Sequence, residues 1–472
     1  MNVPTVRKGE LSQPRTKETV QYAWQQLLQR AGLTEVEAAF YYHPPDGLHP
    51  GRPAVVVVPC CEQAWSELLT RPPGSISALA VSDVFPPDSS PPWDDPIPVP
   101  FWGCGCENAK KPFAEIRPDG VLVFYADIIA TTFFMLSRWE ETVIPERDQH
   151  GRFPAEASVA CKQGFLNRPI VDEYAVILRA WLHAAMPELR FSPAPFRVKL
   201  SHDIDTIRSY ITTKKALAAL RTALFRQHDI AQTGQVLRKI IRQAAVPSKD
   251  AVYRRIYWLA QTSAQYHLQS EFYFLTADPG PWNRHRYKVS SALMQQCFRD
   301  LRDLGAKIGL HAGYEAFDDP QRLHQEKERL EKALKNTPNP LGGRQHYLRF
   351  QVPVTWRCWE QAGLAYDATL AYASHEGFRC GTCHPFRPFD IEFNRELNLL
   401  EQPLIVMDQT LKTYRKMSPE QGEARIIELA QKCQRVNGTF TLLWHNTSLD
   451  GTWEPWAEMY ERVVARLAEM QS

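Results

Sequence analysis

The sequence has no long apolar run and no large excess of either charge. No stretch reaches the roughly 18 consecutive apolar residues that a membrane-spanning helix needs. The basic residues of the N-terminus, "MNVPTVRKGELSQPRTKETVQYAW", are not followed by the apolar segment of a secretory signal. The formal net charge is only +2, whereas nucleic-acid-binding proteins usually have a basic excess or a basic face. We therefore expect a cytoplasmic protein that does not bind nucleic acid.

Cysteine is also scarce, with 10 residues among 472. That number excludes a disulfide scaffold, and we expect the cysteines of a cytoplasmic chain to be mostly reduced. The segment "CGTCH" (380–384) matches the C-x-x-C-H pattern of haem attachment, but no export signal precedes it and no second C-x-x-C completes a zinc site. We interpret it, like "CC" at 60–61 and "CGC" at 104–106, as buried or loop residues.

The length and composition describe a globular protein of more than one domain. A chain of 472 residues, 44% hydrophobic and 23% charged, is expected to form two or three domains. Residues 1–195 have the pattern of a small α/β domain that ends at the Pro-containing linker "MPELRFSPAPF". Its predicted helices are 17–31, 126–141 and 171–185, and its predicted strands are 55–59 and 121–125.

Residues 196–472 alternate between strand and helix patterns. This alternation predicts a parallel sheet or (β/α) barrel, in which active sites collect at the carboxyl ends of the strands. The predicted strands are 196–203, 270–276, 306–312, 345–350, 397–408 and 438–446, and the clearest helices are 289–304 and 321–335. The residues at or near the predicted strand ends are Asp203, Asp205, His311, His346, Asp408 and His445.

A basic helical insertion, about 208–262, separates the first two of these strands. Its cations are Lys214, Lys215, Arg221, Arg226, Arg238, Lys239 and Arg242. A solvated helical face accounts for such a charge run. The alternative is a surface for peripheral contact with an anionic membrane or for a polyanionic substrate.

The segment "KLSHDIDT" (199–206) places two carboxylates on one face of a strand. Residues two apart on a strand point the same way, so Asp203 and Asp205 lie side by side. Imidazole nitrogens and carboxylate oxygens are typical ligands of zinc-like metals. With His311 and His346 at neighbouring strand ends, the pattern predicts a divalent-metal site.

This pattern favours metal-assisted hydrolysis of an amide or ester. If Asp205 binds the metal, Asp203 is free to take a proton from water, and His445 in "LLWHN" can protonate the leaving group. The alternative without a metal is glycoside hydrolysis by the two carboxylates, whose spacing is near the retaining separation of about 5 Å.

The motifs "SHDID", "HAGYE", "RQHY" and "LWH" together resemble those of the NodB-homology polysaccharide deacetylases. The resemblance covers about 196–472 and implies a distorted (β/α) barrel, preceded here by a smaller α/β domain, and a divalent metal, commonly zinc. It implies Asp203 as catalytic base, Asp205 and His311 as metal ligands, and His445 as catalytic acid. The implied substrate is an N- or O-acetylated carbohydrate.

The chain departs from the family pattern in two motifs. The second is usually His-x-x-x-His but here ends at Glu315, so either Glu315 or, as we favour, His346 supplies the third ligand. In the third, Arg344 resembles the family's arginine that pairs with an aspartate, which implies Asp408 as its partner. The backbone amide near Tyr347 would help to hold the oxyanion.

The loop "GFRCGTCH" would line the substrate site. The residues expected there are Phe378, Arg379 and His384, with Arg379 suited to hydrogen-bond a polar substrate. A second hypothesis is a non-catalytic carbohydrate-binding or scaffold protein with a degenerate barrel, because the second motif is altered.

Overall fold

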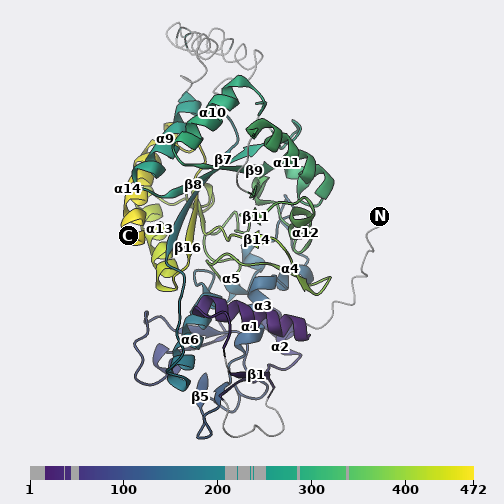
Figure 1. Cartoon of the computed structure of the whole chain (residues 1–472), viewed down its shortest axis with the longest axis vertical. Helices are drawn as coiled ribbons and strands as arrows, with labels where there is room; N and C mark the ends of the chain where they lie inside the picture. The colour runs from purple at the N-terminus through teal and green to yellow at the C-terminus, as the bar shows by residue number, and fades with distance from the viewer. Residues whose placement is uncertain are drawn as a thin grey trace.

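The computed structural model describes residues 16–36, 38–43, 53–207, 251–283, 287–335 and 340–472, with the single residues 221, 234 and 238. It contains a four-stranded sheet and an eight-stranded sheet, which lie toward opposite ends of the long axis (Figure 1). A continuous cluster of buried apolar side chains runs from the helices of the first part into the second. The two parts are therefore packed together.

The N-terminal part is a mixed sheet covered by helices. Its strand order is β1-β2-β6-β5, with β1, β2 and β6 parallel and β5 antiparallel. The strands are β1 (Ala39–Tyr42), β2 (Ala54–Val57), β5 (Ala114–Ile116) and β6 (Leu122–Phe124), with a separate pair of β3 (Ser77–Leu79) and β4 (Ile97–Val99). The helices are α1 (Lys17–Ala31), α2 (Ala64–Thr70), α3 (Ile128–Ser137), α4 (Glu140–Val143), α5 (Val159–Lys162) and α6 (Ile170–Ala185).

Local sequence explains where these helices begin and end. The Thr16 side chain accepts a hydrogen bond from the Thr19 amide and starts α1, and Gly32 ends it in the left-handed region, at φ 89°. The single helix predicted over 126–141 is instead two helices, because Arg138 adopts a left-handed conformation at φ 53°. The buried Arg138 side chain pairs there with Glu140 and Glu141.

One disulfide joins Cys61 to Cys104, and the other eight cysteines remain thiols. The expectation that the cysteines are mostly reduced holds for these eight, whereas the pairing of Cys61 with Cys104 was not predicted. The sequence separation of 43 residues hid the pairing, because only the fold brings the two loops together. Cys380 and Cys383 of "CGTCH" are buried.

The second sheet has eight strands, all parallel, and confirms the predicted parallel α/β architecture. In spatial order they are β14 (Leu400–Glu401), β11 (Tyr366–Asp367), β10 (Gly343–Gln345), β9 (Lys307–Ala312), β8 (Gln269–Leu275), β7 (Arg197–Ile204), β16 (Thr439–Leu443) and β15 (Val406–Met407). The sheet is curled like part of a barrel, and helices lie along its outside (Figure 1). These are α9 (Ala251–Gln265), α10 (Ala292–Asp303), α11 (Pro320–Leu334), α12 (Val354–Gln361), α13 (Pro419–Arg435) and α14 (Glu454–Gln471). A short antiparallel pair, β12 (Phe389–Asp390) and β13 (Arg395–Glu396), lies outside the sheet.

Two predicted strands are shorter than expected. The segment 397–408 forms the two edge strands β14 and β15, and between them the chain crosses from one edge of the sheet to the other. The amide of Leu404 bonds to the Leu370 carbonyl, and that of Ile405 to the Thr441 carbonyl. Pro403 between the strands has no amide hydrogen to donate to a ladder. The segment 345–350 leaves β10 after Gln345, because the next residues form a tight turn.

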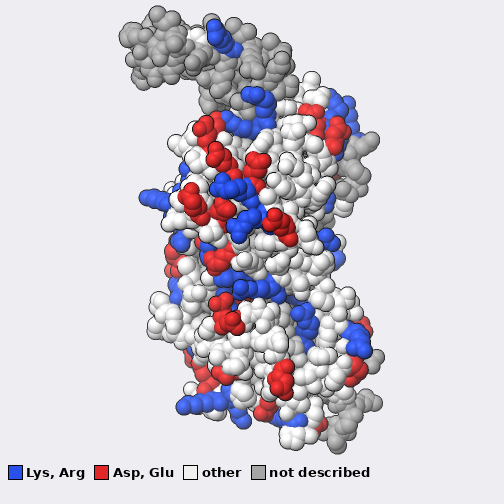
Figure 2. Space-filling model, turned by 90° about the vertical axis from the view of Figure 1, so that its left-hand side faces the viewer, with Lys and Arg blue, Asp and Glu red and all other residues white. Residues whose placement is uncertain are grey.

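Within the described residues, no helix is long and apolar enough to cross a membrane. Of the basic insertion predicted over 208–262, α9 belongs to the described part, but most of the predicted basic residues lie outside it. On the face drawn in Figure 2, basic and acidic side chains are interspersed. That face presents no continuous basic surface among the described residues.

Candidate metal centre

Asp205, His311 and His346 converge at the carboxyl ends of β7, β9 and β10. Their candidate ligand atoms all lie within 4.8 Å of one another. The Nε2 atoms of His311 and His346 are each 3.6 Å from Asp205 Oδ1. The strand order brings these residues together. β9 pairs with β10 in a register that places His311 opposite Arg344, two residues before His346, and β8 lies between β9 and β7.

Hydrogen bonds fix the tautomers of the two imidazoles. His311 Nδ1 lies 2.9 Å from the Arg344 carbonyl oxygen, which can only accept, so Nδ1 carries the hydrogen. His346 Nδ1 lies 3.2 Å from Asn283 Oδ1, and donates in the same way. Each Nε2 atom is thereby turned toward Asp205, the arrangement that outer hydrogen-bond partners give to metal-binding histidines.

The chemistry of this group fits a divalent cation. Asp205 Oδ1 is buried and has no hydrogen-bond partner, and it faces the Nε2 atoms of His311 and His346. Burial favours the neutral form of His346, and with the nearby His311 lowers the pKa of His346 to about 3. Burial opposes the ionisation of Asp205, but His311 and His346 outweigh it and lower the pKa of this carboxyl. An anionic carboxylate and a neutral imidazole are the forms that bind metals.

Asp203 lies beside this group and is held by Arg344. The Asp203 Oδ1 atom accepts a hydrogen bond of 2.8 Å from Arg344 Nη1, while Oδ2 is 3.6 Å from His311 Nε2. Arg344 also donates to Ser201 Oγ, at 3.0 Å. Burial raises the pKa of Asp203, but Arg344, followed by His311 and His445, outweighs it and lowers the pKa. Asp203 is therefore a carboxylate, able to accept a proton.

His445 lies after β16 and is paired with Asp408. His445 Nδ1 is 2.7 Å from Asp408 Oδ1, and the His445 amide donates to Asp408 Oδ2 at 3.1 Å. Burial opposes the charged imidazole, but Asp408, followed by Asp205 and Asp203, raises the pKa of His445 to about 10. The imidazole is therefore protonated near neutral pH and can donate a proton.

The predicted pairing of Arg344 with Asp408 was wrong. Arg344 pairs with Asp203 and Asp408 pairs with His445. The reason is topological, since β10 faces Asp203 across the curled sheet while Asp408 directly follows β15, the neighbour of β16. One pair still includes the predicted base, Asp203, and the other includes the predicted acid, His445.

Glu315 does not belong to the metal group. Its Oε2 accepts a hydrogen bond of 2.6 Å from Asn283 Nδ2, and Asn283 Oδ1 accepts from the Tyr314 amide at 2.9 Å. These contacts orient the Asn283 amide toward His346. Sequence reasoning missed Asn283, which follows β8 and carries no pattern of its own.

The predicted substrate-binding loop lies away from solvent. Phe378 is fully buried, and Arg379 forms two hydrogen bonds to the buried Glu141, at 2.9 and 2.6 Å. His384 Nε2 is 3.0 Å from the Val436 carbonyl. These residues join the loop to other parts of the fold, whereas Tyr347 is 38% exposed beside His346.

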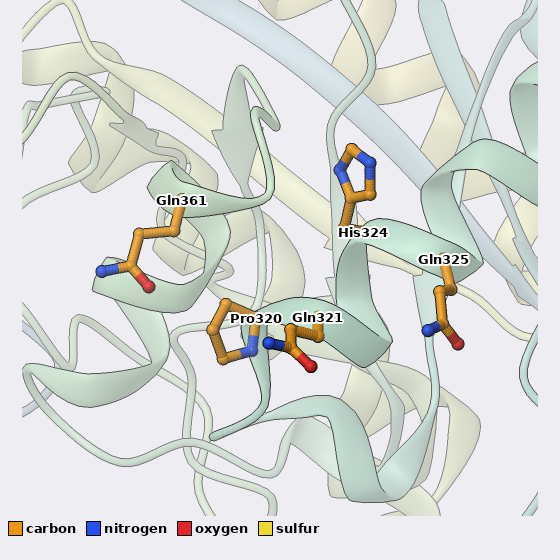
Figure 3. Close-up of a pocket in the computed structure, with 5 residues that line it drawn as sticks. All are labelled: Pro320, Gln321, His324, Gln325 and Gln361. Carbon is orange, nitrogen blue, oxygen red and sulfur yellow. The ribbon is translucent and has the colours of Figure 1, made fainter. Parts of the chain in front are cut away.

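A depression of about 380 Å³ lies between α11 and α12 (Figure 3). Its lining residues are Pro320, Gln321, His324, Gln325 and Gln361. None of them belongs to the metal group or its hydrogen-bond partners. We assign no role to this depression.

Comparisons with known proteins give limited matches. Residues 82–187 match a family described as "Family of unknown function (DUF7033)". No curated protein matches the chain. Among solved structures, the chain is similar to one titled "Crystal structure of putative polysaccharide deacetylase from Mycobacterium smegmatis", with 13% identity, a TM-score of 0.38, and coverage of 59% of this chain and 86% of that chain. These values are too low to support an assignment.

Proposed function

We propose that the protein is a metal-dependent hydrolase that removes acetyl groups, bound as amide or ester, from a carbohydrate. The observation that carries the proposal is the convergence of Asp205, His311 and His346 beside two further acid–base pairs. The donor set of two imidazoles and one carboxylate suits zinc. The resemblance of the sequence motifs to those of polysaccharide deacetylases supports the carbohydrate substrate.

Each residue of the site has a separate task. Asp205, His311 and His346 would hold the cation. When bound, a divalent cation supplies Lewis acidity, which polarises an acyl carbonyl and lowers the pKa of water. Asp203, fixed by Arg344, takes a proton from the attacking water as general base.

His445 completes the reaction as general acid. Its Nδ1 hydrogen is held by Asp408, which leaves Nε2 to deliver a proton to the sugar nitrogen or oxygen as the acyl bond breaks. The base, Asp203, lies on β7, and the acid, His445, follows β16. One residue can therefore take a proton from the attacking water while the other gives a proton to the leaving atom.

The test combines metal analysis with acetate release from a panel of N- and O-acetylated oligosaccharides. We expect Asp203→Asn and His445→Ala each to lower kcat by about 10²–10⁴-fold while retaining bound metal. The matched control is Asp278→Asn, a change at a carboxylate that is 85% exposed after β8, which should leave metal and activity at the wild-type level.

Two outcomes would overturn the proposal in whole or in part. One is wild-type protein that binds no divalent ion. The other, acetate release that survives both Asp203→Asn and His445→Ala, would overturn the assignment of these residues as base and acid. Metal binding and glycan binding without any acetate release would favour the non-catalytic alternative.

A further inference from the structure

Two exposed aromatic rings lie next to the metal centre. Trp282, in the loop after β8, is 41% exposed, and Tyr347 is 38% exposed. The Tyr347 ring lies 4.7 Å, centroid to centroid, from the ring of His346. Exposed apolar side chains that lie together often mark interaction sites, and Trp282 and Tyr347 lie next to each other beside the metal centre.

The two rings form a rigid corner. Trp282 stacks on Tyr314 with centroids 5.0 Å apart and an angle of 22° between the planes. Tyr347 stands nearly perpendicular to both, at 81° to Trp282 and 90° to Tyr314. Stacked and edge-on contacts of this kind stabilise aromatic side chains in one orientation. Trp282 and Tyr347 thus present fixed surfaces before a ligand arrives.

The backbone places Tyr347 in this position. Tyr347 has φ 62° and ψ 12°, and Leu348 has φ 53°. Left-handed conformations are unfavourable for residues with a side chain, and strain of this kind clusters at functional sites. The turn directs His346 to the metal group while the Tyr347 ring remains exposed.

A loop of the N-terminal part completes the corner. The ring of His150 lies 5.3 Å from Trp282 and 5.0 Å from Tyr347, and His150 Nδ1 is 3.2 Å from Tyr314 Oη. Arg152 Nη1 donates to the Tyr347 carbonyl at 2.7 Å. Residues more than 100 positions away in sequence therefore build one wall of the site.

Ionic and backbone contacts hold this loop in place. Asp148 Oδ1 accepts from the amides of His150 and Arg152, at 2.8 and 3.0 Å, and Asp148 Oδ2 accepts from Arg152 Nε at 2.7 Å. Arg349 Nε donates to the His150 carbonyl at 3.1 Å. The loop lies within residues 82–187, the segment that matches the family of unknown function.

We infer that Trp282 and Tyr347, supported by the buried His150, form a subsite for a pyranose ring adjacent to the sugar that carries the reacting acetyl group. This inference rests on the proposed function. It specifies an oligosaccharide substrate of at least two rings, and it gives the N-terminal part a role in recognising that substrate.

The chemistry of the corner matches a neutral sugar. One face of a pyranose carries C–H groups, which pack on an aromatic ring, while its hydroxyls lie at the edge and can reach polar groups. The two arginines beside the corner already have partners. Arg152 forms an ion pair with Asp148 and donates to the Tyr347 carbonyl. Arg349 donates to backbone carbonyls and lies over the rings of Tyr314 and Phe317. An uncharged ring therefore fits better than an anionic ligand.

The test is calorimetric binding of xylotetraose, cellotetraose and N-acetylated chitotetraose to the metal-loaded protein. Two of these probes carry no acetyl group, so their binding does not depend on catalysis. For the tetrasaccharide that binds wild-type protein best, Trp282→Ala should raise Kd about tenfold, which is about 1.4 kcal/mol. His150→Ala should raise Kd about threefold, because its ring only supports the other two.

Two further variants separate recognition from folding. Trp282→Phe keeps an aromatic face and should restore Kd to within about threefold of wild type. Phe393→Ala removes a ring that is 44% exposed at a different place in the fold, and should leave Kd unchanged. Metal content measured on each variant reports whether the centre is intact.

The results distinguish the subsite from the proposed function. Sugar binding that depends on Trp282 without any acetate release supports the subsite and overturns the function. Acetate release by wild-type protein that Trp282→Ala leaves unaltered overturns the subsite and supports the function. The subsite is also overturned if no tetrasaccharide binds, or if Phe393→Ala weakens binding as much as Trp282→Ala does.

Discussion

The eight-stranded sheet contains two pairs of acidic side chains, one at the metal centre and one on β11 and β14. At the metal centre, Asp203 and Asp205 lie among an arginine and three histidines. Those neighbours outweigh burial and keep both carboxylates ionised. Asp205 retains a buried oxygen without a hydrogen-bond partner.

The second pair, Asp367 and Glu401, is fully buried and opposite each other in register. Burial raises the pKa of both carboxyls, and the proximity of each to the other adds to the shift for Glu401. Trp356 Nε1 donates to Glu401 Oε2 at 2.8 Å, and Thr369 donates to Asp367. The raised pKa values favour a protonated carboxyl in this pair, and Trp356 and Thr369 donate hydrogen bonds to it.

The difference shows that the neighbours of an acidic pair decide its chemistry. In the pair Asp367 and Glu401, burial outweighs the effect of Arg344 on Asp367 and favours the protonated form, because two adjacent negative charges are costly when buried. Two carboxylates beside an arginine and the protonated His445 stay ionised and can bind a metal and accept a proton. The following predictions test this contrast.

The largest effect is expected for the metal ligand. Asp205→Asn removes the anionic oxygen that faces both imidazoles, so the variant should retain less than about a tenth of the bound metal, since even outer hydrogen-bond partners contribute 10–100-fold in affinity. Glu401→Gln, the matched change in the other pair, should bind metal as wild type does. Elemental analysis after gel filtration measures both. Equal metal content in the two variants would show that the contrast is wrong.

The next effect concerns the cation that keeps Asp203 ionised. Arg344→Gln leaves a buried carboxylate without its partner, which should lower the free energy of unfolding by about 3–5 kcal/mol. Urea denaturation of the metal-free proteins measures the loss. A decrease of less than about 1 kcal/mol would mean that Arg344 contributes no more than a surface ion pair does.

A smaller effect is expected from the partner of His346. Asn283→Ala removes the acceptor for the His346 Nδ1 hydrogen, so the metal should bind about 10–100-fold more weakly. Competition with a chelator of known affinity measures the change. The control is Gln321→Ala, in the depression of Figure 3, which should leave metal affinity unchanged. An unaltered affinity in Asn283→Ala would remove this residue from the site.

The smallest effect is the pH dependence of the buried acidic pair. Both carboxyls have raised pKa values in the folded protein, so above the ordinary carboxyl pKa of about 4 the unfolded chain loses protons that the folded chain keeps. This pair therefore lowers stability as pH rises through the weakly acid range toward neutral. Glu401→Gln removes one titrating group and should be more stable, relative to wild type, at pH 7.5 than at pH 4.5, by about 1 kcal/mol.

Thermal unfolding at several pH values tests this last prediction. The melting temperature of Glu401→Gln minus that of wild type should increase with pH. A difference that decreases with pH would mean that Glu401 is ionised in the folded protein, as Asp205 is.

Much of the fold and part of the site could be predicted from residue periodicity. Alternation of strand and helix predicted the parallel sheet, and the two-residue period of a strand placed Asp203 beside Asp205. Polar residues at strand ends indicated His311, His346 and His445. These features depend on nearby residues, which is why the sequence alone reveals them.

Contacts between distant segments could not be predicted in the same way. Arg344 was expected to pair with Asp408, but Arg344 pairs with Asp203 and Asp408 pairs with His445. Which side chains meet depends on the order of the strands around the sheet. Phe378 and Arg379 were expected to contact substrate, yet the loop that carries them is buried in contact with Glu141. Asn283, Trp282 and His150 carry no pattern that distinguishes them from ordinary loop residues.

The sequence by itself determined the parallel α/β architecture and the residue types available at its strand ends. The tertiary structure decided which of those residues meet, since side chains such as His150 and Trp282 are 132 positions apart in the chain and 5.3 Å apart in space. It also decided their charge states. Protonation depends on burial and on neighbouring charges, and both are properties of the packed molecule.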